Sequence, residues 1–107
     1  MSVRVVDGDT IVIDGETIRI ANIDTPETRR ARCANERNLG FIATNRVRDL
    51  LSGAQIGIVR GDPLDGRLHD RYGRTLAVIS VNGRDLGEIL IAEGLARRWP
   101  DGPKFWC

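Results

Sequence analysis

Several residue types are scarce in this chain, and each scarcity excludes a class of protein. One lysine stands against fifteen arginines and the net charge is +1, which excludes a protein that binds nucleic acid by bulk charge alone. The only cysteines, Cys33 and Cys107, fit no zinc-binding pattern. No apolar run approaches the roughly 18 residues that a membrane-spanning helix needs, so we expect no membrane association.

The length of 107 residues predicts a single domain, residues 1–107, that buries enough apolar surface to fold unaided. Met1–Val6 leads directly into a strand pattern, without the apolar stretch of a signal peptide. We therefore expect either a cytosolic protein or the mature or trimmed form of an exported one. No feature implies an obligate protein partner, and we expect a monomer.

Cys33 and Cys107 allow one disulfide, which would hold the end of the chain beside the acidic segment at residues 24–28. Both thiols would stay free in a reducing cytosol. A cysteine pair that includes the last residue favours export. The sequence leaves open whether the bond forms.

The hydrophobic pattern predicts short strands joined by turns. Asp14-Gly15 and Asn82-Gly83 are strong signals for two-residue hairpin turns. Pro26 ends one strand and opens an arginine-rich loop. We expect strands over residues 3–6, 10–13, 16–23, 55–60 and 75–81.

Two helices are expected. The first runs from about Glu36 to Leu51 and stops before Gly53. The second follows Asp85, which with Glu88 resembles a capping box, and ends at Gly94. The apolar stripe of the first helix consists of Leu39, Ile42, Ala43, Val47, Leu50 and Leu51.

Short strands in hairpins with a helix between the third and the fourth predict a mainly β fold. Closing such a sheet removes its unpaired edges, and the OB-fold is the small barrel of this kind. We therefore expect a five-stranded Greek-key barrel with about two helices.

Three carboxylates, those of Asp9, Asp24 and Glu27, lie in two turn-like segments close together in the sequence. Two neighbouring carboxylates repel unless a cation or a proton intervenes. Oxygen ligands favour calcium or magnesium over zinc or copper. Each segment taken alone is also explained as an ordinary turn, since Asp, Gly and Pro are common there.

Arg19 lies within a strand between Ile18 and Ile20, where a charge needs a partner. In an ideal hairpin about Asp14-Gly15, Arg19 faces Thr10, and Asp9 points to the other side. Asp24 would lie roughly 13 Å further along the strand. A bulge or strong coiling is needed to bring the three charges together, so spacing alone does not establish a site.

The motifs taken together resemble the staphylococcal nuclease (thermonuclease) family. Their order and approximate spacing agree with that family from about Val3 to Arg98. They are Val6–Thr10, Ile18–Ile20, Asp24–Thr28, Asp70–Arg74 and Glu93–Arg97.

The resemblance implies a calcium ion bound by Asp9, Asp24 and the backbone carbonyl of Thr25. It also implies hydrolysis of phosphodiester bonds in single-stranded or locally melted DNA and in RNA, leaving a 3′-phosphate. Glu27 would orient or deprotonate the attacking water.

The same resemblance assigns the cationic residues. Arg19 and Arg74 would hold the scissile phosphate, and Tyr72 and Arg71 would border the nucleotide pocket. For Trp99, packing in the core is favoured over a place in the pocket wall.

Two alternatives stay open. A non-catalytic module of the same family would bind nucleic acid or protein without cutting it, but such copies typically lack some of the charged residues present here. A generic OB-fold binder of single strands would need stacking aromatic residues, which make up only 5% of this chain.

Overall fold

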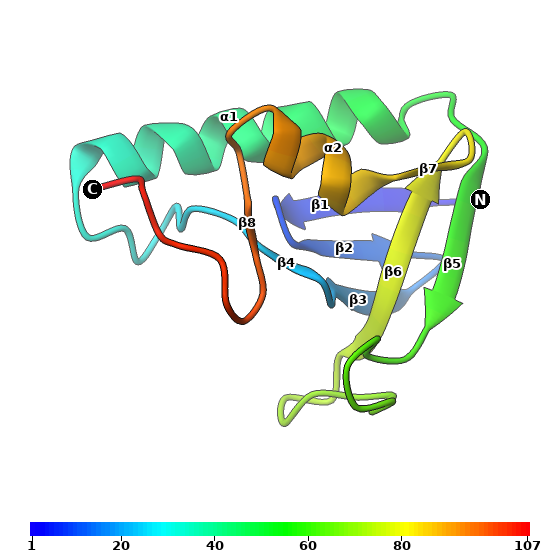
Figure 1. The fold of residues 1–107 in the computed structure, drawn as a ribbon. Coiled ribbons are helices and arrows are strands. Elements are labelled where there is room, and N and C mark those ends of the chain that lie inside the picture. Colours follow the sequence, from blue (N-terminus) through cyan, green and yellow to red (C-terminus); the bar gives the residue numbers. More distant parts are fainter.

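The computed structural model describes residues 1–107 (Figure 1). Four strands precede the first helix, three strands lie between the two helices, and one short strand follows the second helix. In order, the elements are β1 (Val3–Asp7), β2 (Thr10–Ile13), β3 (Glu16–Ile20), β4 (Ile23–Asp24), α1 (Ala34–Leu51), β5 (Ile56–Arg60), β6 (Thr75–Val81), β7 (Arg84–Asp85), α2 (Leu86–Ala92) and β8 (Arg97–Arg98).

The main sheet has the strand order β1-β2-β3-β6-β5, with β7 paired to β6. The first three strands form an antiparallel meander, β3 pairs with β6 in parallel, and β5 pairs with β6 antiparallel. The prediction of two helices among mostly strands is confirmed, in a mixed α/β fold whose main sheet has six strands instead of the expected five. No ladder joins β1 to β5, so hydrogen bonds do not close this sheet into a barrel.

Both predicted hairpin turns are present. Asp14 and Gly15 have φ angles of 49° and 84°, and Asn82 and Gly83 have 51° and 82°. Two successive residues with positive φ give a type I′ turn, whose twist matches that of the flanking strands. The first turn sets Ile13 opposite the first residue of β3 and so fixes the register of the β2–β3 pair.

The strand predicted over residues 16–23 is broken into β3 and β4. At the break the Ala21 amide bonds to the carbonyl of Ala77, and the Asn22 carboxamide bonds to the Asp85 carboxylate at 3.3 Å. These contacts turn the chain out of the main sheet, so that β4 pairs with β8 in a small second sheet. This turn places Asp24 in the second sheet, where its carboxylate lies 4.0 Å from Arg19.

Helix α1 begins at Ala34, before the expected start, because Cys33 is its N-cap and its sulfur accepts from the Glu36 amide. Gly53, with a φ of 69°, follows its end as expected. The placement of Ile42 in the core stripe was wrong, since this side chain is 52% exposed. The reason is the close approach of Gly40 to the preceding loop, which turns Ile42 towards solvent.

One apolar core lies between the main sheet and the two helices, with α1 running along the top of the sheet and α2 in front of it (Figure 1). Isoleucine dominates this core because β-branched side chains suit strands that pack on a helix. Its fully buried members include Ile11, Ile18, Ile20, Ile23, Val47, Ile79, Leu86 and Leu90.

Neither helix has the length and apolar character needed to cross a bilayer.

The last residues return to the start of α1, where Cys107 forms a disulfide with Cys33 (Figure 1). The side chain of Trp106 is buried there, and its carbonyl accepts from Asn35 at 2.8 Å. The expectation that Trp99 packs in the core was wrong, because Trp99 is 45% exposed and Trp106 is the buried tryptophan.

We predict that the disulfide contributes up to about 4 kcal/mol to the free energy of unfolding, because the bond links residues 74 positions apart and restricts the unfolded chain. The double variant Cys33→Ser/Cys107→Ser keeps an oxygen at the N-cap and removes the bond. Urea unfolding should show a lower midpoint for the variant. A thiol reductant should lower the wild-type midpoint equally and leave the variant unchanged; an unaffected wild type would contradict the prediction.

Candidate functional site

Asp9 lies in the turn between β1 and β2 and is almost completely buried. The β1–β2 register shifts between Val5 and Asp7, and this bulge redirects the turn. Gly8 then packs against Thr25: a Cβ at position 8 would lie 2.8 Å from the Thr25 hydroxyl oxygen. The Thr25 amide donates to Asp9 Oδ2 at 3.2 Å. The turn is therefore held against the segment that follows β4.

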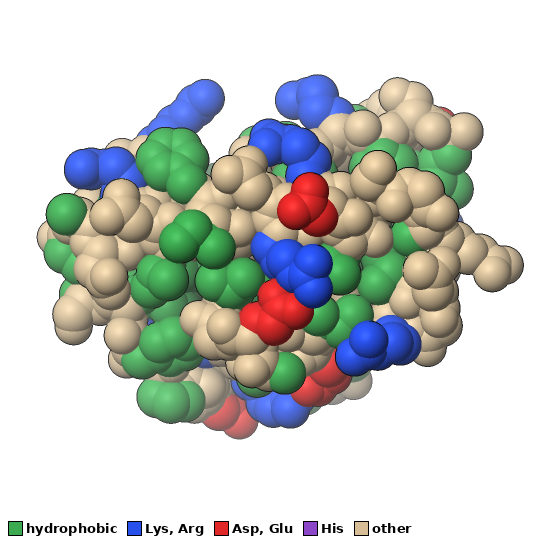
Figure 2. Space-filling model, turned by 90° about the horizontal axis from the view of Figure 1, so that it is seen from above, with side chains coloured by type: hydrophobic (Ala, Val, Ile, Leu, Met, Phe, Trp, Pro, Cys, Tyr) green, Lys and Arg blue, Asp and Glu red, His purple; other side chains and the backbone are tan.

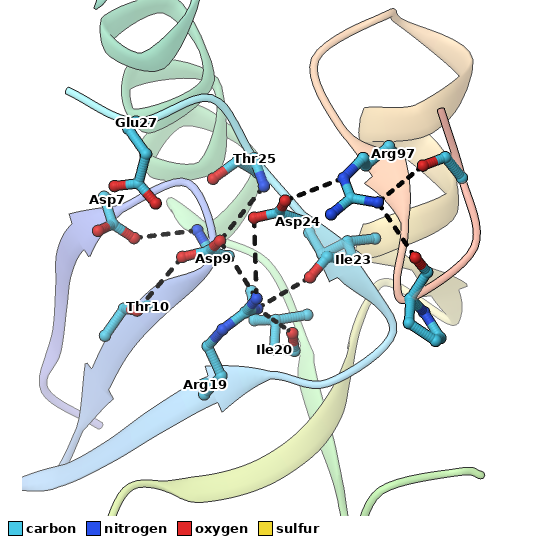
Figure 3. A network of polar contacts seen from close by, with 12 residues as sticks. Asp7, Asp9, Thr10, Arg19, Ile20, Ile23, Asp24, Thr25, Glu27 and Arg97 are labelled. Carbon is cyan, nitrogen blue, oxygen red and sulfur yellow. Dashed lines mark hydrogen bonds and ion pairs between the residues drawn. The ribbon is translucent and has the colours of Figure 1, made fainter. Parts of the chain in front are cut away.

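Arg19 lies between the carboxylates of Asp9 and Asp24 (Figure 3). Its Nη2 atom is 3.5 Å from Asp9 Oδ2 and 4.0 Å from Asp24 Oδ1. Its Nη1 atom donates to the carbonyls of Ile20 and Ile23 at 2.6 and 2.9 Å. Arg19 faces Thr10 across the hairpin, as expected, and the bulge brings Asp9 within its reach.

Asp24 has a second cationic partner that the motif analysis did not assign to the site. Arg97 Nε donates to Asp24 Oδ2 at 3.0 Å, and its Nη1 donates to the carbonyls of Pro100 and Gly102 (Figure 3). Asp24 and Arg97 are opposite each other in the β4–β8 pair. Pairing of these two short strands thus orients Asp24.

Glu27 is positioned by contacts that helix α1 makes with its backbone. The buried carboxylate of Glu36 accepts from the amides of Glu27 and Arg32 at 3.1 and 2.8 Å. A Cβ at Gly40 would lie 2.8 Å from the Glu27 carbonyl oxygen, so the helix packs directly on this loop. The Glu27 carboxylate points towards Asp7 and Asp9 (Figure 3).

Arg74 approaches the same cluster from the loop before β6. Its Nε donates to Asp70 Oδ2 at 2.7 Å, and its Nη1 donates to the Thr10 hydroxyl at 3.3 Å. The Thr10 hydroxyl is itself 3.4 Å from Asp9 Oδ1. Asp70 also accepts from the amides of Tyr72 and Arg74, which fixes the turn between them.

Arg71 and Tyr72 form an exposed rim beside Arg74. The Arg71 guanidinium donates to the Tyr72 hydroxyl at 2.8 Å and lies 4.9 Å from its ring centre. Arg74 lies 5.5 Å from the same ring. The tyrosine is 68% exposed, so a ligand can reach it.

Several carboxylates of the site lie close together and are partly or wholly shielded from water. Burial raises the pKa of Asp9 to about 6, although Arg19 lowers it in part. Partial desolvation and then the charges of Asp9 and Asp24 raise the pKa of Glu27. Burial alone would raise the pKa of Glu36, but the amides of Arg32 and Glu27 outweigh it and hold this pKa below its ordinary value.

The donor chemistry of the cluster fits a hard cation, since Asp9 and Asp24 face one guanidinium and offer only oxygen atoms. No three His, Cys, Asp or Glu side chains converge as a ready-made metal cage. Calcium takes 6–8 oxygen ligands and accepts water and carbonyl oxygens among them, so a complete protein cage is not required.

The structure thus brings together Asp9, Arg19, Asp24, Thr25 and Glu27, joins Arg74 to them through Thr10, and places Arg71 and Tyr72 at the rim. Sequence reasoning missed Asp7, whose carboxylate accepts from the Asp9 amide at 3.2 Å, and it missed Glu36. Glu36 carried one signal, its position three residues after the helix N-cap.

Comparison with known proteins identifies the family. A family model described as "Staphylococcal nuclease homologue" matches residues 17–103.

The chain belongs to the staphylococcal nuclease family. Within the matched range lie Arg19, Asp24, Glu27 and Arg74, whereas Asp9 precedes it.

Three relatives are informative. The chain is 38% identical to the SPbeta prophage-derived endonuclease YokF and 37% identical to the endonuclease YncB, both of Bacillus subtilis (strain 168), in each case over 88% of its length. It is 33% identical to the thermonuclease of Staphylococcus intermedius over 95% of its length. The matches span 32%, 44% and 61% of these relatives, respectively, so the relatives are longer proteins.

Gly40→Ala tests the contact between α1 and the Glu27 loop. Replacing glycine by alanine inside a helix ordinarily stabilises it by up to about 1 kcal/mol. Here the new methyl would lie 2.8 and 2.9 Å from the carbonyls of Glu27 and Pro26, and we expect destabilisation by about 1–3 kcal/mol instead. Asn38→Ala on the exposed face is the control and should be neutral or stabilising in urea unfolding. A stabilised Gly40→Ala protein would contradict this packing.

Asp9→Asn tests the buried charge in metal-free protein. The pKa of Asp9 rises from 3.8 to about 6 on folding, so the folded state holds an extra proton between these values. The contribution of Asp9 to the free energy of unfolding should therefore be greatest below pH 3.8 and should fall by about 3 kcal/mol as the pH rises to about 6.

The Asp9→Asn protein should lack this component and be the more stable of the two at pH 7 in the presence of a chelator. Urea unfolding of both proteins at pH 4 and pH 7 measures it. Identical pH dependence of the free energy of unfolding in the two proteins would show that the charge of Asp9 does not destabilise the folded state.

Proposed function

We propose that the protein is a calcium-dependent nuclease that hydrolyses phosphodiester bonds in single-stranded or melted DNA and in RNA. The observation that carries the proposal is the grouping of Asp9 and Asp24 about Arg19, with the Glu27 carboxylate pointing towards Asp9 and Arg74 arriving from a separate segment. Family membership and relatives named endonuclease and thermonuclease support it. We further propose that the main sheet functions as an OB-type barrel with the site on its rim.

Phosphodiester hydrolysis needs positive charge arranged in advance around the phosphate oxygens. Arg19 is held by two backbone carbonyls and Arg74 by Asp70, so neither guanidinium has to be ordered when substrate binds. Both arginines keep further N–H groups that are free to bond a phosphate. We assign these two residues to stabilising the charge that gathers on the scissile phosphate.

The water that attacks phosphorus needs a base, and Glu27 is the proposed one. Its raised pKa makes the carboxylate a stronger proton acceptor than an ordinary glutamate. Glu36 and Gly40 fix its backbone, so the carboxylate is presented from a rigid segment. Orientation of the water is an equally useful role for the same group.

Asp9, Asp24 and the backbone carbonyl of Thr25 are the proposed calcium ligands. When bound, the ion would supply positive charge for the phosphate oxygens and would relieve the repulsion between the two carboxylates. Arg97 and the Thr25 amide hold these ligands in place from behind. Each carboxylate thus has a fixed protein contact besides Arg19, and its oxygens keep lone pairs for a metal ion.

Tyr72 and Arg71 are proposed to border the nucleotide next to the scissile phosphate. The exposed face of the tyrosine ring suits a base, and the guanidinium above the ring suits a phosphate. The family resemblance implies a product ending in a 3′-phosphate, and we propose the same product here. No step requires a second protein chain.

The proposal predicts that Glu27→Gln lowers kcat by about 10²–10⁴-fold, because the variant keeps the shape and loses the base. Arg19→Ala and Arg74→Ala should each cost about 3–4 kcal/mol of transition-state stabilisation. The control is Arg67→Ala, since Arg67 is exposed and pairs only with Asp65. Cleavage of denatured DNA, followed with calcium and then with a chelator, measures these effects.

Loss of cutting in the chelator, restored by calcium, is the expected result for the wild-type protein. Binding of DNA without any cutting under both conditions would instead identify a non-catalytic module. A loss of only a few-fold in the Arg19 and Arg74 variants would show that their roles are misassigned.

A further inference from the structure

A groove of about 600 Å³ lies between α1 and the loop after Glu27, outside the cluster described above. The proposed nuclease mechanism uses none of its lining residues. Its principal ones are Val6, Thr28, Arg29, Arg37, Phe41 and Arg48.

The charge of this groove is uncompensated. Arg29, Arg37 and Arg48 have no carboxylate within ion-pair distance, whereas Arg46 on the same helix is paired with Glu93. Arg48 donates only to the Asn45 carboxamide. No acidic residue lines the groove. Three unpaired guanidiniums around one hollow therefore favour an anionic occupant.

The groove residues of α1 form one face of the helix. These residues recur every three or four positions along the helix, at Arg37, Phe41, Thr44 and Arg48. They therefore form one row, which is separate from the row that packs on the apolar core. Phe41 is 54% exposed, so its ring is available within the basic row. Figure 2 views the molecule from above, the side on which α1 lies, and shows basic side chains projecting at one edge of the molecule with hydrophobic side chains beside them.

The groove is continuous with the site along the chain. Thr28 and Arg29 follow Glu27 directly, and Val6 precedes Asp7, whose carboxylate bonds to the Asp9 amide. The contact of Gly40 with the Glu27 carbonyl fixes the helix relative to this loop. A strand that leaves the scissile position past Glu27 would therefore enter the groove.

We propose that this groove binds a further stretch of the single-stranded substrate, with phosphates on Arg29, Arg37 and Arg48 and a base stacked on Phe41. A basic track that includes an aromatic ring is the combination that single-strand binding uses, because phosphates and base faces are present in every sequence. This inference rests on the proposed nuclease function. An acidic peptide would satisfy the charges but would leave the exposed ring unused.

The test measures binding in the Glu27→Gln background, which keeps the site and is expected not to cut. Fluorescence anisotropy with a labelled 20-residue oligothymidylate is compared with a labelled dinucleotide, with calcium present, over a series of salt concentrations. The variants are Arg37→Gln/Arg48→Gln and Phe41→Ala, all at exposed positions. Arg84→Gln is the matched control, since Arg84 is also exposed, forms no ion pair and lies outside the groove.

Each arginine that contacts a phosphate contributes about 0.7 to the slope of log K against log salt for single strands. The double variant should therefore lower the slope for the long oligonucleotide by about 1.4, and Phe41→Ala should weaken its binding about tenfold. Both effects should be much larger for the long oligonucleotide than for the dinucleotide, and Arg84→Gln should change neither.

Three results would overturn the proposal: an unchanged salt slope in the double variant, equal effects on long and short ligands, or equal binding of an oligoglutamate peptide that is insensitive to Phe41→Ala. Calcium-dependent cutting by the wild-type protein together with any of these results would reject the groove and leave the nuclease assignment standing. If no oligonucleotide binds and the wild-type protein cuts nothing, both proposals fail. Thermal unfolding of each variant separates lost binding from lost folding.

Discussion

The contact of Arg19 with Asp9 and Asp24 is the interaction on which the rest of the site depends. Without a cation between them, two poorly solvated carboxylates would repel each other, and one would hold its proton. The guanidinium is itself held by the carbonyls of Ile20 and Ile23, at the point where the strand leaves the main sheet. The break between β3 and β4 is therefore part of the site: it supplies the carbonyls that orient the arginine and aims Asp24 at it.

Helix α1 packs on the sheet and also holds the Glu27 loop, and the first of these roles is easier to predict from its sequence than the second. One face packs on the sheet through Ala43, Val47 and Leu51. Its first turns hold the loop that carries Glu27, through the buried carboxylate of Glu36 and through the absence of a side chain at Gly40. The loop has little regular structure of its own, so its geometry comes from the helix. A loop fixed in this way can present a carboxylate rigidly without belonging to a strand or a helix.

The elements with a local signal could be predicted from the sequence. Asp14-Gly15 specifies its turn through backbone preference alone, and the first helix follows from its apolar period. The bulge before Asp7 leaves no periodic trace, which is why spacing placed Asp9 and Arg19 on opposite sides. The bond from Arg97 to Asp24 depends on the pairing of two very short strands that are 73 residues apart, and no local pattern encodes it. The family motifs supplied the grouping of charges that periodicity could not.

The disulfide at the end of the chain places the two termini in unlike surroundings. Cys107 is bonded to Cys33, and its sulfur is 3.8 Å from the Glu36 carboxylate that holds the Glu27 loop. The amino terminus lies at the opposite end of the molecule (Figure 1). Any polypeptide joined after Cys107, whether a tag, a surface linker or another domain, would emerge against the loop that carries Glu27. One joined before Met1 would leave that neighbourhood untouched.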